Sequence, residues 1–164
     1  MKSYKVTFLG LLLAFALILS YIESVIPFYF GIPGMKLGLA NMAVLLALYC
    51  YGAGEAFVLS VIRVTLASFL FGNLYSLIYS GMGALCSFAV MLLMKKTGRF
   101  SMTGVSIGGG VFHNLGQIAV AMAVIETLGG LYYVPVLMIA GMATGALIGI
   151  AASTVEPYIR KVMK

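Results

Sequence analysis

Long apolar runs, separated by short polar or glycine-rich turns, make up nearly all of the 164-residue chain. A helix that crosses a bilayer needs about 20 mostly apolar residues. Six such runs extend over residues Val6 to Ile26, Leu37 to Tyr51, Gly54 to Phe71, Leu74 to Met94, Thr103 to Leu128 and Tyr133 to Val155. The second run is short, and its helix could begin in the preceding loop. The pattern predicts an all-α, polytopic integral membrane protein, a compact six-transmembrane-helix bundle in one domain, residues 1–164.

The composition supports a membrane location. The chain is 63% hydrophobic and only 9% charged, whereas a soluble domain carries roughly 25% charged residues. So few charges cannot cover the surface of a soluble protein. The net charge of +6 does not indicate nucleic-acid binding, because the basic residues lie at the ends of the runs and form no continuous basic face.

The basic residues indicate the orientation of the bundle. Eight of the ten precede the first run, lie between the fourth and fifth, or follow the sixth: Lys2, Lys5, Lys95, Lys96, Arg99, Arg160, Lys161 and Lys164. With six spans these three places share one side of the membrane. The positive-inside rule then predicts a multi-pass protein of the cytoplasmic membrane with both termini in the cytoplasm. Residues 1–22 resemble a signal peptide, but no small-residue cleavage site ends the run, so we expect this helix to be retained.

Small residues at four-residue spacing predict close helix packing. Gly141, Gly145 and Gly149 lie on one face of the sixth run. Helices in lipid associate through such faces because small residues let their backbones approach closely. We expect this face to pack inside the bundle, with a contact to another membrane subunit as the alternative.

Motifs of soluble enzymes are missing from the sequence. It contains no phosphate-binding GxxxxGK[ST], and the glycines 108–110 lack the spacing of a dinucleotide-binding turn. The single histidine, His113, has no aspartate or nearby cysteine with which to bind zinc. Cys50 and Cys86 match no metal or redox spacing. We therefore expect no cofactor, no metal site and no catalytic residues.

Polar side chains inside the spans are the candidates for a binding site, because ionisable residues in a membrane are costly and by default functional. Arg63 lies about midway along the third run. His113 and Asn114 lie about midway along the fifth, with Gln117 one turn further. Other polar residues gather at the outer ends of the runs. This asymmetry predicts a pocket that reaches from the outer surface to mid-membrane, lined by Lys36, Asn41, Arg63, Asn73, Tyr75, Tyr79, His113, Asn114 and Gln117.

These residue types suit a small polar or anionic ligand. Arg63 offers a charged fork to a carboxylate or phosphate, and the amides of Asn114 and Gln117 can orient a ligand through hydrogen bonds. Tyr75 and Tyr79 could stack on a ring. A purely structural role remains open, in which Glu23 or Glu126 neutralises Arg63 and the amides bond helices together.

Four segments carry a family resemblance: IPGMKLGLANM (32–42), RVTLASFLFG (63–72), LYSLIYSGMGALCSFAVM (74–91) and GVSIGGGVFHNLGQIAVA (104–121). They resemble the heptaprenyl diphosphate synthase component I family, also called the Gx transporter family. That family is similar to the substrate-binding S components of energy-coupling factor transporters. The resemblance implies uptake of a small molecule with a membrane scaffold subunit and two ATPases as partners. It also implies that the loop Gly31–Lys36 is an outer gate and that Gly10, Ala14 and Ala16 of the first helix face the scaffold.

The residues argue against a prenyl synthase activity in this chain. Prenyl synthases bind diphosphate through magnesium held by aspartate-rich motifs, and magnesium prefers carboxylate oxygens. The chain has no aspartate, and its four acidic residues, all glutamate, are scattered over different segments. We expect an S-component-like protein that is not an enzyme. The alternatives are a non-catalytic membrane subunit associated with heptaprenyl diphosphate synthase and a structural membrane partner without a ligand.

Overall fold

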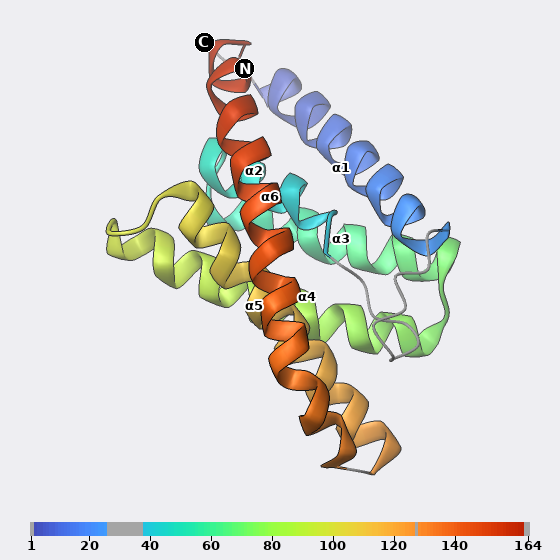
Figure 1. The fold of residues 1–164 in the computed structure, drawn as a ribbon. Helices are drawn as coiled ribbons and strands as arrows, with labels where there is room; N and C mark the ends of the chain where they lie inside the picture. Colours follow the sequence, from blue (N-terminus) through green and yellow to red (C-terminus); the bar gives the residue numbers. More distant parts are fainter. Residues whose placement is uncertain (1, 26–37, 127, 163–164) are drawn as a thin grey trace.

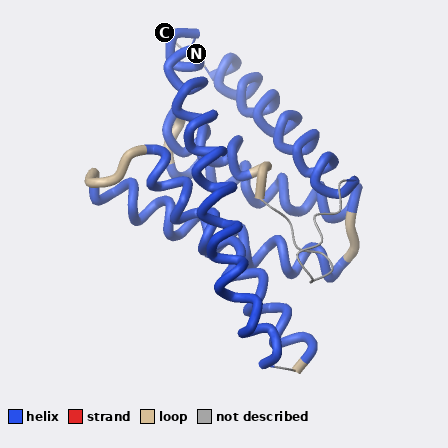
Figure 2. The backbone as a smooth tube through the Cα atoms, in the orientation of Figure 1, coloured by secondary structure: helices blue, strands red, loops and turns tan. Residues whose placement is uncertain are grey.

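The computed structural model describes residues 2–25, 38–126 and 128–162. These residues form helices joined by short turns and include no strand (Figures 1 and 2). The all-α fold class is therefore confirmed. The elements are α1 (Lys2–Val25), α2 (Asn41–Cys50), α3 (Ala53–Phe71), α4 (Leu74–Thr97), α5 (Met102–Ile125), the 3₁₀ helix η1 (Leu128–Tyr133) and α6 (Val134–Val162).

Five of the helices are long and apolar enough to cross a membrane, and α2 is the exception. The sequence predicts a second helix over Leu37–Tyr51, but α2 begins at Asn41, after Gly38 adopts a positive φ of 79°. Its 10 residues extend over about 15 Å, half the roughly 30 Å of hydrocarbon in a bilayer. The expectation that the second run is short is confirmed, and α2 alone is too short to cross the bilayer.

Helix α2 lies inside the protein. It packs against α1, α3, α4 and α6, and all six residues from Ala43 to Leu48 are buried. Carbonyl groups near its carboxyl end accept hydrogen bonds from basic side chains. Lys95 Nζ donates to Leu48 O at 2.5 Å, and Arg160 Nη2 donates to Tyr49 O at 3.0 Å. Cations stabilise the carboxyl end of a helix, where carbonyl groups lack partners.

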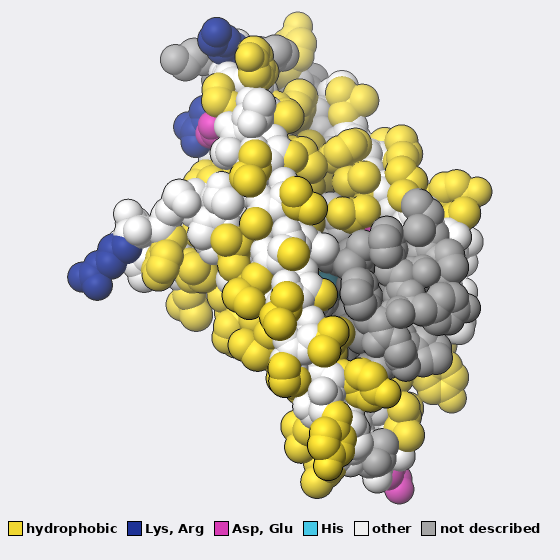
Figure 3. Space-filling view, in the orientation of Figure 1, with side chains coloured by type: hydrophobic (Ala, Val, Ile, Leu, Met, Phe, Trp, Pro, Cys, Tyr) yellow, Lys and Arg dark blue, Asp and Glu magenta, His cyan; other side chains and the backbone are white. Residues whose placement is uncertain are grey.

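Basic side chains from α1, α4 and α6 lie near the carboxyl end of α2 or the turn that follows it. Lys5 of α1 forms an ion pair with Glu55, close to the carbonyls that Lys95 and Arg160 bind. Both ends of the chain lie at this end (Figure 1). Figure 3 shows dark-blue basic atoms near the top of the view and at its left edge. Hydrophobic side chains cover much of the remaining described surface, which contacts lipid.

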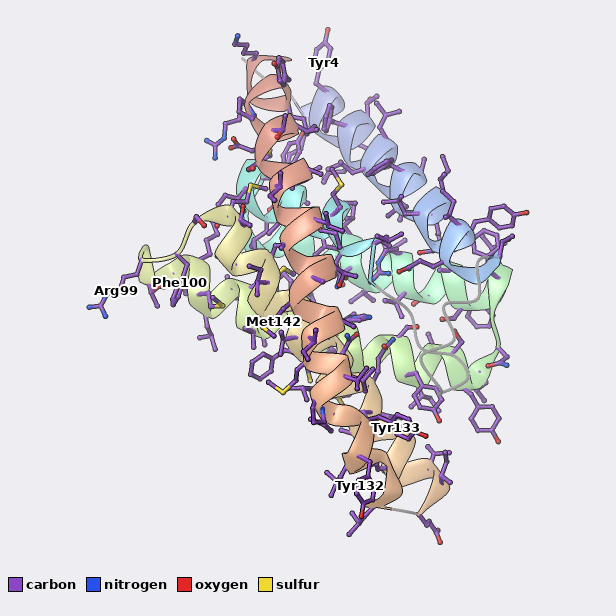
Figure 4. The ribbon with its side chains drawn as sticks, in the orientation of Figure 1. Tyr4, Arg99, Phe100, Tyr132, Tyr133 and Met142 are labelled. Atoms are coloured by element: carbon purple, nitrogen blue, oxygen red, sulfur yellow. The ribbon has the colours of Figure 1, made fainter. Side chains whose placement is uncertain are left out.

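Helix α6 is longer than predicted. The apolar run ends at Val155, but the helix continues through Pro157 to Val162. Glu156 and Arg160, which lie one helical turn apart, form an ion pair that stabilises these last turns. At the other end of α6, Tyr132 and Tyr133 project from η1 (Figure 4), where aromatic rings suit the membrane–water interface.

The glycine face of α6 packs within the bundle. A Cβ added to Gly110 of α5 would lie 2.4 Å from Gly141 O, and one added to Gly145 would lie 2.7 Å from Ile107 Cα. The backbones of α5 and α6 therefore touch, which confirms the intramolecular prediction.

The proposed scaffold face of α1 needs one correction. Gly10 and Ala14 are exposed, but Ala16 is fully buried in the core. Two residues along a helix correspond to a rotation of about 200°, so Ala16 cannot share the face of Ala14.

Candidate functional site

A row of buried polar side chains crosses the interior and joins four helices. We call it the polar row: Asn41 of α2, Arg63 of α3, Ser87 of α4, and His113 and Gln117 of α5, none more than 7% exposed. Arg63 Nη2 donates to Asn41 Oδ1 at 3.3 Å, and Asn41 Nδ2 donates to Ser87 Oγ at 3.4 Å. The amide of Asn41 thus connects α3 to α4.

Two glycines bring His113 into this row. A Cβ added to Gly38 would lie 3.2 Å from Asn41 Nδ2 and 3.4 Å from His113 Cδ2. A Cβ added to Gly83 would lie 3.0 Å from His113 Cε1 and 2.9 Å from Gln117 Cγ. The imidazole therefore lies between two backbone surfaces without side chains, and the order along the row is Arg63, Asn41, His113, Gln117.

Glu23 is the acidic side chain next to this row. It is buried, its Oε1 accepts a hydrogen bond of 2.8 Å from the backbone N–H of Leu39, and it interacts electrostatically with Arg63. Glu126, the other counter-ion considered from the sequence, is exposed at the carboxyl end of α5. Of the two pairings considered, the structure therefore supports the one with Glu23.

Several polar atoms at and beside the row have no hydrogen-bond partner within the described part of the chain. They are Arg63 Nε, Ser68 Oγ, and both Nε2 and Oε1 of Gln117. Leaving such a group buried without a partner costs about 1–3 kcal/mol, and native proteins rarely do so without a reason. These atoms are the buried hydrogen-bonding groups at and beside the row that the described side chains leave unused.

Other predicted site residues lie elsewhere. Asn73 is exposed and caps α4, its Oδ1 accepting from Ser76 N at 2.9 Å, because asparagine before a first helical turn satisfies a free N–H. Tyr75 is 62% exposed on the first turn of α4, away from the row. Neither side chain is therefore part of the polar row. Tyr79 is half-buried. Lys36 and the gate loop Gly31–Lys36 lie outside the described residues.

Asn114 is buried but serves another contact. Its Nδ2 donates to Leu137 O of α6 at 2.8 Å. One residue corresponds to about 100° around a helix, so Asn114 faces α6 while His113 faces α4. The donor of Asn114 bonds two helices together, the structural role considered as its alternative.

The model of one protein family, heptaprenyl diphosphate synthase component I, matches residues 12–155. The chain belongs to the heptaprenyl diphosphate synthase component I family. Comparison with curated proteins and with solved structures finds no match. The matched range contains the whole polar row, and the word "component" in the family name implies a partner polypeptide.

Sequence reasoning missed part of the site in this component I protein. Ser87 and the glycines that enclose His113 were not among the predicted residues, because small residues are common in packed membrane helices. The spacing of Ser80, Gly83 and Ser87 in the sequence could have indicated this face of α4, because residues three and four apart lie on one side of a helix. All three are buried in the structure. Such a small and polar face indicates the side of α4 that faces the row.

The protein also has an apolar groove on its surface. It lies between α1 and α3, has a volume of about 550 Å³, and is lined by Val6, Leu9, Gly10, Leu13, Gly54, Glu55, Val58, Leu59 and Ile62. The groove is separate from the polar row, and its chemistry suits hydrocarbon.

Proposed function

We propose that this component I protein binds a small polar or anionic molecule at the polar row, as the substrate-binding membrane component of an uptake system. One observation carries the proposal: Arg63 Nε and both amide atoms of Gln117 are buried without partners among the described residues. A ligand that supplies these hydrogen bonds would remove a cost of roughly 1–3 kcal/mol for each group. A purely structural row would instead be paired throughout.

The position of the row supports entry from outside. Asn41 begins α2, and the basic side chains of Lys95 and Arg160 bind the other end of the same helix. The positive-inside rule assigns the basic end to the cytoplasm. The row then lies in the outer half of the bundle, and both termini are cytoplasmic.

Energy for uptake would come from partners. The sequence has no nucleotide-binding motif, so we propose a membrane scaffold subunit and ATPases as partners. The exposed face of α1 with Gly10 and Ala14 would contact the scaffold, because small residues permit close helix approach.

Native mass spectrometry of the detergent-purified protein tests the proposal. We expect a small molecule bound to the wild type, its loss in Arg63→Ala and Gln117→Leu, and its retention in Arg99→Ala. Arg99 is an exposed arginine of the α4–α5 turn (Figure 4) and serves as the matched control. Two row variants are needed because Arg63→Ala leaves Glu23 buried without its cation, which is costly. Retention of the molecule by both folded row variants would refute the proposal.

The family name favours a second candidate, a non-catalytic membrane subunit of heptaprenyl diphosphate synthase. The apolar groove between α1 and α3 is the surface that such a subunit would offer to a polyprenyl chain. This role predicts copurification with an aspartate-rich soluble synthase and a polyprenyl product. The uptake role predicts copurification with ATPases.

A further inference from the structure

We propose that the ligand of the polar row carries a hydrogen-bond donor and an acceptor on adjacent atoms, as in a lactam, imide or ureide, and that this edge pairs with Gln117. The inference rests on the proposed function and names the chemical class that the site would select. It comes from Gln117, the side chain of the polar row whose amide oxygen and nitrogen both lack a hydrogen-bond partner among the described residues.

Gln117 presents one acceptor and one donor group in a single plane. Its side chain is 2% exposed, and neither Oε1 nor Nε2 has a partner among the described residues. Turning the amide by 180° would leave this requirement unchanged, because the edge still offers one donor and one acceptor. Only a group that also offers both can satisfy it with two parallel hydrogen bonds.

The aliphatic part of the Gln117 side chain is also packed closely. The Cγ of Gln117 lies against the backbone of α4 at Gly83, where an added Cβ would be only 2.9 Å away. Its neighbour one turn earlier, His113, touches the same glycine. Because this part of the side chain is already packed, Gln117 loses less freedom on binding a ligand than a mobile side chain would.

Other ligand classes fit less well. Inorganic phosphate or diphosphate offers acceptors to Arg63 Nε and Gln117 Nε2, but its anionic oxygens would meet Gln117 Oε1 unfavourably. A hydrocarbon chain would satisfy none of these atoms. A molecule with an anionic acceptor for Arg63 at one end and an amide-like edge for Gln117 at the other satisfies all of them.

The chain offers a direct reporter, because Gln117 is its only glutamine. Protein labelled with ¹⁵N at the glutamine side-chain amide gives a single NH₂ signal, which is assigned by its loss in Gln117→Met. We would titrate the labelled protein in detergent with δ-valerolactam and with δ-valerolactone, which replaces the ring N–H by oxygen. Inorganic diphosphate serves as the anion that lacks an amide-like edge.

We expect the lactam to shift the Gln117 signal saturably and the lactone to bind at least about tenfold more weakly, because it leaves Oε1 without a donor. A lactam titration without a saturable shift, or equal binding of lactam and lactone, overturns the inference. A larger effect of diphosphate than of the lactam overturns it as well. If a copurified molecule is lost in the Arg63 variant but the lactam leaves Gln117 unchanged, the proposed function stands and this inference fails.

Discussion

The substitution Gly83→Ala tests the enclosure of the polar row, and Gly81→Ala on the same helix is its matched control. The added Cβ at position 83 would lie 2.9 Å from His113 O, 2.9 Å from Gln117 Cγ and 3.0 Å from His113 Cε1. The same atom at position 81 would meet nothing within 4 Å. The two changes are identical in chemistry and differ only in the space available.

The expected difference follows from these distances. Ordinary contact begins near 3.4 Å, so α4 and α5 must separate by several tenths of an ångström at Gly83, and His113 O belongs to a backbone that cannot rotate away. Overpacking of this kind costs about 1–3 kcal/mol. Replacing a helical glycine by alanine gains about 0.5–1 kcal/mol in both variants and cancels in their comparison. We therefore expect Gly83→Ala to be about 1–3 kcal/mol less stable than Gly81→Ala.

Thermal unfolding in detergent measures this difference. Cys50 and Cys86 are free and half-buried, so their reaction with a thiol-reactive fluorophore follows unfolding without a further label. At roughly 2–4 °C per kcal/mol for a chain of this size, Gly83→Ala should melt several degrees below Gly81→Ala. It should also lose any small molecule that copurifies with the wild type. Equal melting temperatures would refute the close contact between α4 and α5.

Three further predictions follow from the same structure. Lys95→Met removes a cation from the carboxyl end of α2 and should destabilise the protein by about 0.5–1 kcal/mol in the same melting assay. Substitution of the exposed neighbouring residue, Lys96→Met, should leave the melting temperature unchanged. Asn114→Ala breaks a bond between α5 and α6 and should cost about 1 kcal/mol; an unchanged melting temperature would contradict that role. With both native cysteines replaced by serine, Arg99→Cys should react with an impermeant maleimide only in inside-out vesicles and Glu126→Cys only in right-side-out cells. Labelling from the same side would contradict the orientation.

The sequence predicted the helices and the centre of the site, because both depend on polarity along the chain. Arg63, His113 and Gln117 lie mid-span in apolar runs, and charged or strongly polar groups there must turn inward. The structure buries all three. Polarity alone could not assign the faces of helices, so Asn114 was grouped with His113 although it points toward α6.

The remaining differences between expectation and structure have local causes. From the sequence, Asn73 was assigned to a group of polar residues at the outer ends of the runs. In the structure its Oδ1 accepts a hydrogen bond from the backbone N–H of Ser76 at the start of α4. The second run was read as a short span because hydropathy is equally high for a helix in lipid and for a helix buried inside a protein. Neither the positive φ of Gly38 nor the close approach of Gly83 to α5 leaves a hydropathy signal.

Helix α2 has a consequence for biosynthesis. A segment of about 15 Å whose middle residues face protein on every side cannot be stabilised by lipid alone during insertion. One of its terminal carbonyl groups accepts a hydrogen bond from Arg160 of α6. Helix α2 therefore reaches its final environment only after α6 has entered the bilayer, and assembly of this protein finishes at a helix that was translated second.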